Sequence, residues 1–376
     1  PSPHPVGAGA LFMRPPAILG GARHPPGQGR GSGQPKRGGC LEPFLVVQSK
    51  LVVAKSKTPT KTIADFPGLR EMTPAMRPEE ARVESQRCLT CFDAPCIAAC
   101  PTHIDVPRFI RQIATTDPLG SAVTILEANP LGHSCARVCP VEALCEGSCV
   151  FHDWHEKPIQ IARLQRYATD HIHAGGWQAF APGKATGKKA AIVGAGPAGL
   201  SCAAYLRRLG VAVTLFEAKP KPGGLNTYGI AEYKLDGPTS LDETAMVLDL
   251  GADIRYGVQV GKKLPFERLT KEFDAVFLGV GLGAGHSLGV PGEHLPGVYE
   301  ALALIERIKH HDFKSIPPGE VTVCIGAGNT AVDVVTQVKR LGTPKVVMAY
   351  RRAPEDMSAY PYEYELAKGD AVEFLW

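Results

Sequence analysis

The amino-acid sequence predicts an α+β protein of several domains, in which an all-helical part precedes two α/β folds. Its 376 residues exceed one domain, at roughly 150 residues per domain. Residues 78–173 carry helix signals throughout. After a small-residue linker at 174–187, strands and helices alternate up to residue 376, a pattern typical of a parallel sheet.

The helical part is predicted to contain several separate helices. Pro78-Glu79-Glu80 places a proline and two acids in a first turn, so we expect a helix to begin there. Residues 107–130 predict two short helices that are broken at Asp117-Pro118, and residues 159–173 predict another helix.

The first 60 residues differ in composition from the rest. Residues 1–40 contain ten Gly, eight Pro and no acid, so we expect residues 1–60 to form a disordered tail. Eight Lys or Arg against Glu42 alone give this tail a charge of +7, which leaves −3 for residues 61–376 of the total of +4. The slightly acidic remainder argues against a nucleic-acid-binding surface.

Targeting signals are weak in this sequence. Leu11-Phe12-Met13 runs into Arg14-Pro15-Pro16 before the apolar core of a secretory signal could form, and a transit peptide is the less favoured interpretation of the tail. No uninterrupted apolar run reaches the roughly 18 residues that a membrane span requires. We therefore expect a cytoplasmic protein without a membrane segment.

Eight of the eleven cysteines fall into two groups of four between residues 88 and 149. The groups are Cys88-x2-Cys91-x4-Cys96-x3-Cys100-Pro101 and Cys135-x3-Cys139-Pro140-x4-Cys145-x3-Cys149. Short spacings aim several thiolates at one point, and proline after a cysteine is typical of ferredoxin-like runs, so the pattern predicts two [4Fe-4S] clusters. Structural zinc is the weaker alternative, because only one Cys-x2-Cys pair occurs, and disulfides are weaker still.

A glycine-rich turn follows the strand predicted at 188–193. It comprises Gly194, Ala195, Gly196, Pro197, Ala198 and Gly199. Glycines there permit a tight turn and a close approach of backbone to a pyrophosphate at the helix N-terminus. Glu217, 23 residues after Gly194, ends the next strand and can accept hydrogen bonds from ribose hydroxyls.

A second such turn follows the strand predicted at 321–325. It comprises Gly326, Ala327, Gly328, Asn329, Thr330 and Ala331. The next strand ends in Arg351-Arg352 rather than in an acid, and a guanidinium pair suits a 2′-phosphate. The pattern thus favours NADPH over NADH, with a solvent-facing arginine pair as the alternative.

Together these motifs resemble the dihydropyrimidine dehydrogenase and glutamate synthase small-subunit superfamily over residues 78–376. The resemblance implies a helical ferredoxin-like domain with two clusters at 61–173, then glutathione-reductase-like FAD and NAD(P) Rossmann domains at 188–285 and 286–376. It also implies one cluster on Cys88, Cys91, Cys96 and Cys149, and another on Cys100, Cys139, Cys145 and Gln165. If Gln165 is instead a core amide, Cys135 is the expected fourth ligand.

The resemblance also implies where FAD lies. Its expected contacts are the turn from Gly194 to Ala198, Glu217, the loop Pro222-Gly223-Gly224-Leu225, Lys234, and backbone near Val260. A solvated surface lysine is the alternative for Lys234. The family continues beyond the equivalent of Trp376 with a further FAD-contacting segment, so weak FAD binding is expected from a truncated chain.

The predicted cofactors suggest the order in which electrons pass from one carrier to the next. A hydride carries two electrons and an iron–sulfur cluster passes one, so flavin must stand between them. We therefore expect NAD(P)H to reduce FAD, and the clusters to pass single electrons to a partner subunit. No catalytic side chain is predicted, because hydride transfer needs positioning rather than a general base.

Three functions are compatible with this order of electron carriers. Gln165 and Pro101-Thr-His-Ile-Asp-Val-Pro107 resemble the flavin subunit of bacterial NAD-dependent dihydropyrimidine dehydrogenase, whose partner is expected to carry FMN and further clusters and to reduce uracil or thymine. The alternatives are a glutamate synthase small subunit and a non-catalytic carrier or assembly module. A hetero-oligomer is expected for either enzyme.

Overall fold

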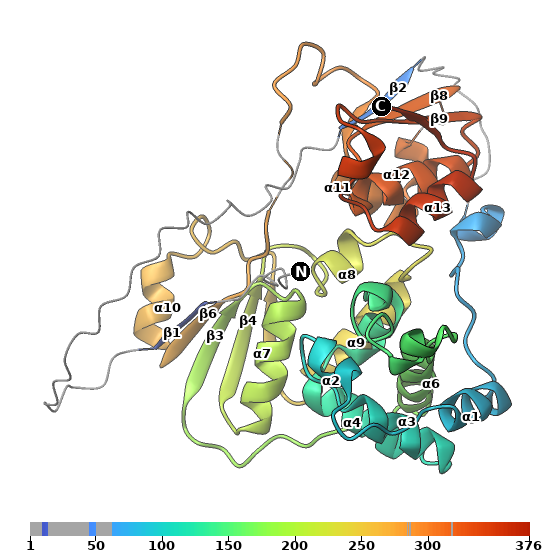
Figure 1. Ribbon diagram of the computed structural model, residues 1–376. Helices are drawn as coiled ribbons and strands as arrows, with labels where there is room; N and C mark the ends of the chain where they lie inside the picture. The colour runs from blue at the N-terminus through green and yellow to red at the C-terminus, as the bar shows by residue number, and fades with distance from the viewer. Residues whose placement is uncertain (1–9, 14–44, 50–61, 284, 286, 317–318) are drawn as a thin grey trace, which may run out of the picture.

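The computed structural model describes residues 10–13, 45–49, 62–283, 285, 287–316 and 319–376. Its helical domain lies beside two sheet-containing domains (Figure 1). The helices of this domain are α1 (Pro78–Gln86), α2 (Pro95–Ala99), α3 (Val106–Ala114), α4 (Pro118–Ala128), α5 (Gly132–Val138) and α6 (Ile161–Ala174). Helices α1, α3, α4 and α6 match the sequence prediction, including the break between α3 and α4, whereas α2 and α5 were not predicted.

Short polar caps start α3 and α4. The side chain of Asp105 accepts a hydrogen bond from the Arg108 amide at 3.1 Å, and that of Asp117 accepts one from the Gly120 amide at 2.8 Å. Proline follows close behind each cap, where its missing N–H has no cost. These local signals explain why the break could be predicted from the sequence.

An apolar stripe on α6 fills the centre of the helical domain. Ile161, Leu164, Ala168 and Ile172 recur at helical spacing and are fully buried, against α3 and α4. The stripe fixes which face of α6 points inward. Gln165 follows Ile161 by four residues and precedes Ala168 by three, so it lies on that buried face.

The first sheet has the order β1-β6-β3-β4-β5 and is parallel except for β1. Its strands are β1 (Ala10–Met13), β3 (Lys189–Val193), β4 (Ala212–Glu217), β5 (Asp253–Tyr256) and β6 (Ala275–Leu278). The helices of this domain are α7 (Pro197–Arg208), α8 (Leu225–Tyr228), α9 (Gly237–Leu248) and α10 (Phe266–Glu272). Helix α9 packs against both α7 and α5, so it connects this domain to the helical domain.

The second sheet has the order β10-β9-β8-β2-β7. Its strands are β2 (Leu45–Ser49), β7 (Val298–Glu300), β8 (Val321–Ile325), β9 (Lys345–Ala349) and β10 (Glu373–Leu375), with β8, β9 and β10 parallel. The helices are α11 (Ala301–Lys309), α12 (Asn329–Arg340) and α13 (Pro361–Gly369). The units β3–α7 and β8–α12 show the internal similarity found in the sequence.

Two stretches of the expected tail differ from the disordered state predicted for it. Residues 10–13 pair antiparallel with β6, and residues 45–49 lie between β7 and β8. Open strand edges present unpaired backbone groups that a short extended segment can satisfy, whatever the overall composition of that segment. The rest of residues 1–61 lies outside the described residues.

Among the residues that the structure describes, we find no helix with the length and apolar character that crossing a bilayer requires.

Candidate functional site

Four thiols, here called the first thiol group, line one cavity in the helical domain. They are Cys88, Cys91, Cys96 and Cys149. The rest of the wall is mainly apolar, including Val106, Ile110, Phe151, Ile159 and Ile161. Burial raises the pKa of Cys88, and it raises the pKa of Cys96 to about 12, so a metal must displace the thiol protons. Soft sulfur donors around an apolar cavity fit an iron–sulfur cluster.

A second thiol group lies at the C-terminal end of α5 and consists of Cys100, Cys135, Cys139 and Cys145. Cys135 lies in α5 and Cys139 ends it. A hydrogen bond with Cys135, together with burial, raises the pKa of Cys139, and burial raises the pKa of Cys145 to about 12. In the described part of the chain, no three His, Cys, Asp or Glu side chains form a single-ion site.

The two thiol groups do not follow the order of the cysteines in the sequence. Cys149 lies with the thiols of the first group, and Cys100 lies with those of the second. This crossed arrangement fits the two ligand sets that the family resemblance implies.

Gln165 lies beside the second thiol group. Its Nε2 donates to the carbonyl of Gly132 at 2.8 Å, and its side chain also reaches Cys135. The pKa of Cys135 is lowered by a hydrogen bond with Cys139 and, against the effect of burial, by Gln165. The sequence offered Gln165 and Cys135 as alternative ligands. Both side chains lie at the second thiol group, so the choice between them stays a prediction.

The glycine turn after β3 lets other backbone segments pack closely against it. Gly194 has φ +97°, and a Cβ there would lie 2.4 Å from the Gly279 carbonyl oxygen. A Cβ on Gly199 would lie 2.0 Å from the Gly194 carbonyl oxygen, so this helix packs directly on the turn. The Gly223 amide donates to the Ala195 carbonyl at 2.7 Å, which joins the loop before α8 to the same turn. These backbone surfaces fit a dinucleotide pyrophosphate.

Glu217 ends β4 beside this turn. Its Oε2 accepts a hydrogen bond from the Ala195 amide at 2.8 Å, and its Oε1 accepts one from the Lys219 amide at 2.7 Å. Each carboxylate oxygen has more than one acceptor site, so Glu217 retains capacity for ribose hydroxyls. The arrangement fits FAD, with Gly196, Pro197, Ala198, Gly224 and Leu225 along the same edge.

The second glycine turn has a comparable form. Gly326 has φ +122°, and Gly328 precedes α12, whose first turn contains Asn329, Thr330 and Ala331. The Asn329 side chain accepts a hydrogen bond from the Tyr360 amide at 2.9 Å, so Asn329 also holds the segment before α13. Arg351 and Arg352 follow β9 and are exposed.

Lys234 is largely buried and is not a solvated surface lysine, and its expected FAD contact stays a prediction. Its Nζ lies 2.7 Å from Oδ1 of Asp333 and also pairs with Glu363, so it joins the flavin domain to α12 and α13. Burial alone would lower the pKa of Lys234, but the charges of Asp333 and Glu363 raise it. Val260 forms an isolated bridge with Leu264, and its proposed flavin contact stays a prediction.

Two sequence families match this chain. "Dihydropyrimidine dehydrogenase domain II, 4Fe-4S cluster" matches residues 66–177, and "Pyridine nucleotide-disulphide oxidoreductase" matches residues 188–365. The NAD-dependent dihydropyrimidine dehydrogenase subunit PreT of Salmonella typhimurium is 39% identical over 293 residues, which cover 78% of this chain and 70% of the relative. The chain belongs to the PreT and glutamate synthase small-chain family.

A second relative in this family is the glutamate synthase [NADPH] small chain of Halomonas elongata, 36% identical over 330 residues, or 85% of this chain and 69% of the relative. Membership confirms the predicted fold class, enzyme class and cofactors. The protein is an NAD(P)H-dependent oxidoreductase subunit that uses FAD and [4Fe-4S] clusters.

Sequence reasoning missed Glu243, which connects α9 to α5. Glu243 is 1% exposed and follows the buried Ser240 by three residues, with Thr244 and Val247 on the same face. The available signal was a single carboxylate on an otherwise small and apolar helix face. Such a residue is usually predicted to be exposed to solvent, because an unpartnered charge is rarely buried.

Proposed function

We propose that this chain is the electron-input subunit of a dihydropyrimidine dehydrogenase. It takes electrons from NAD(P)H and delivers them, through FAD and two clusters, to a catalytic partner that reduces uracil or thymine to 5,6-dihydropyrimidines. Similar proteins are named as a subunit and as a small chain, which supports a hetero-oligomer. The proposed partner carries FMN and further iron–sulfur clusters, and the complex works in the cytoplasm.

The cluster ligands are part of the proposal. One cluster is assigned to the first thiol group, and the other to Cys100, Cys139, Cys145 and Gln165. The observation that carries the choice of pyrimidine reduction is the buried amide of Gln165 at the second thiol group. The resemblance to the dihydropyrimidine dehydrogenases implies an amide at this position, and it favours them over the glutamate synthase small subunits.

Affinity purification of the full chain with its partner from its source cells tests the proposed substrate. We expect NAD(P)H oxidation to depend on added uracil or thymine and to yield the 5,6-dihydropyrimidine. Oxidation that depends instead on glutamine and 2-oxoglutarate, with formation of glutamate, would assign the chain to glutamate synthase.

The same assay tests the choice of nucleotide. Arg351 and Arg352 lie where a 2′-phosphate is expected in a Rossmann fold, and they favour NADPH on electrostatic grounds. We therefore expect a lower KM for NADPH than for NADH. A lower KM for NADH would remove the phosphate-binding role from this arginine pair.

A further inference from the structure

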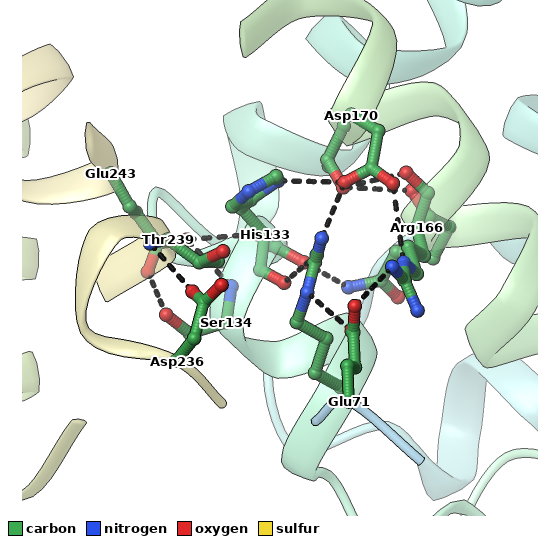
Figure 2. A network of polar contacts seen from close by, with 12 residues as sticks. Glu71, His133, Ser134, Arg166, Asp170, Asp236, Thr239 and Glu243 are labelled. Atoms are coloured by element: carbon green, nitrogen blue, oxygen red, sulfur yellow. Dashed lines mark hydrogen bonds and ion pairs between the residues drawn. The ribbon is translucent and has the colours of Figure 1, made fainter. Parts of the chain in front are cut away.

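Glu243 of α9 holds the first turn of α5 across the boundary between the flavin and helical domains. Its Oε1 accepts hydrogen bonds from the amides of His133 at 2.8 Å and Ser134 at 3.0 Å, and its Oε2 accepts one from the Ser134 hydroxyl. Figure 2 shows the Glu243 carboxylate reaching this turn from the α9 side. One buried carboxylate thus satisfies three donors of the helix that carries Cys135.

The same turn of α5 is also held by α6. The Gln165 amide of α6 donates to the carbonyl of Gly132 at 2.8 Å, one residue before the amides that Glu243 binds. Cys135 is the next residue after Ser134, and the Cys139 amide donates to the Cys135 carbonyl at 3.0 Å. The backbone that positions Cys135 and Cys139 is therefore fixed between α6 and α9.

A charged network fixes the rest of α5 within the helical domain. Arg137 pairs with Asp170 at 2.6 Å and with Glu71 at 3.1 Å, and both acids also pair with Arg166 of α6. Figure 2 shows this network beside the Glu243 contact. These ion pairs lie within the helical domain and the segment before α1, so they do not set the distance from α5 to the flavin domain. That distance depends on the polar contacts of Glu243 and on Leu131, the N-cap of α5, which packs in the core of the flavin domain.

A short series of contacts extends from Glu243 to the flavin loop. On α9, Ser240 lies one turn before Glu243, and its hydroxyl lies 2.8 Å from that of Thr227 in α8. The Thr227 hydroxyl in turn donates to the carbonyl of Pro222 at 2.6 Å, at the start of the Gly223-Gly224 loop. The loop assigned to FAD and the helix assigned to the second cluster are thus connected through α9.

We propose that Glu243 is a positioning residue that sets the geometry between the flavin site and the second thiol group, and so the rate of electron passage between them. The proposal rests on the proposed assignment of the second thiol group as a cluster site. A displaced α5 would alter the path between the flavin site and the second thiol group, and we expect it to leave the reduction of the flavin by NAD(P)H unchanged. Small displacements of positioned groups have large kinetic effects.

Glu243→Gln in the full chain tests this inference, with Asp242→Asn as the matched control on the exposed face of α9. We expect both variants to keep their iron and the wild-type rate of flavin reduction by NADPH, measured by stopped-flow absorbance. Reduction of the second cluster, followed by rapid-freeze electron paramagnetic resonance, should slow about tenfold in Glu243→Gln only. Its resonance signal should also change, while that of the first cluster stays the same.

Ser134→Ala provides a second variant, because it removes one of the three donors and leaves the carboxylate. We expect a smaller slowing, and no further slowing when it is combined with Glu243→Gln. The inference would be overturned if iron-replete Glu243→Gln reduced its second cluster at the wild-type rate and the signal of that cluster were unchanged. A wild-type chain that binds only one cluster would overturn the ligand assignment instead, so the two failures are distinguishable.

Discussion

Replacing Cys149 with Ser is expected to remove the cluster of Cys88, Cys91 and Cys96, although Cys149 follows Cys145 by only four residues. Replacing Cys145 should remove the other cluster. Each substitution removes a thiolate ligand, and iron content should fall from about eight to about four atoms per chain. Iron and labile-sulfide analysis, with electron paramagnetic resonance to identify the surviving cluster, checks this expectation.

The matched control is Cys202→Ser in α7, a half-buried thiol that lies in neither thiol group. It should retain the full iron content. Loss of the same resonance signal from the Cys149 and Cys145 variants would show that neighbouring cysteines share a cluster, and it would contradict the crossed arrangement that the structure shows.

Substitution of Gly199 by Ala is expected to abolish FAD binding and to destabilise the flavin domain by about 3 kcal/mol. The added Cβ would lie 2.0 Å from the Gly194 carbonyl oxygen and 3.1 Å from the Ile192 side chain, so α7 must move away from β3. That movement separates the helix N-terminus from the phosphate-binding turn. Titration of the flavin-free chain with FAD, compared with the unmutated chain, and the thermal transition of the flavin domain measure the two effects.

Gly369→Ala is a suitable control, because an added Cβ at the end of α13 meets no atom within 4 Å. It should leave flavin content and the thermal transition unchanged. A Gly199→Ala chain with stoichiometric FAD would show that direct contact between α7 and the turn is not required for binding.

The parts of the fold that could be predicted have local causes. Asp117 caps α4 and Pro118 begins it, so two adjacent residues specify where this helix starts. The turns at Gly194 and Gly326 need positive φ, which glycine adopts readily, and each follows a strand directly. The burial of Gln165 follows likewise from its spacing to Ile161 and Ala168 on α6.

The parts that could not be predicted depend on contacts between distant segments. Glu243 bonds to residues more than one hundred positions earlier in the chain, and Lys234 pairs with acids 99 and 129 positions later. Nothing in the sequence next to either residue specifies these partners. The pairing of residues 10–13 with β6 is similarly decided by an available strand edge and not by the composition of the tail.

Anaerobic titration of the cluster-reconstituted, FAD-loaded chain with NADPH tests the central claim most directly. We expect the flavin absorbance and the broad cluster absorbance to bleach together, with reduced-cluster signals in electron paramagnetic resonance, because one chain connects the nucleotide, the flavin and both thiol groups. Bleaching of the flavin alone, with both clusters still oxidised, would contradict the account.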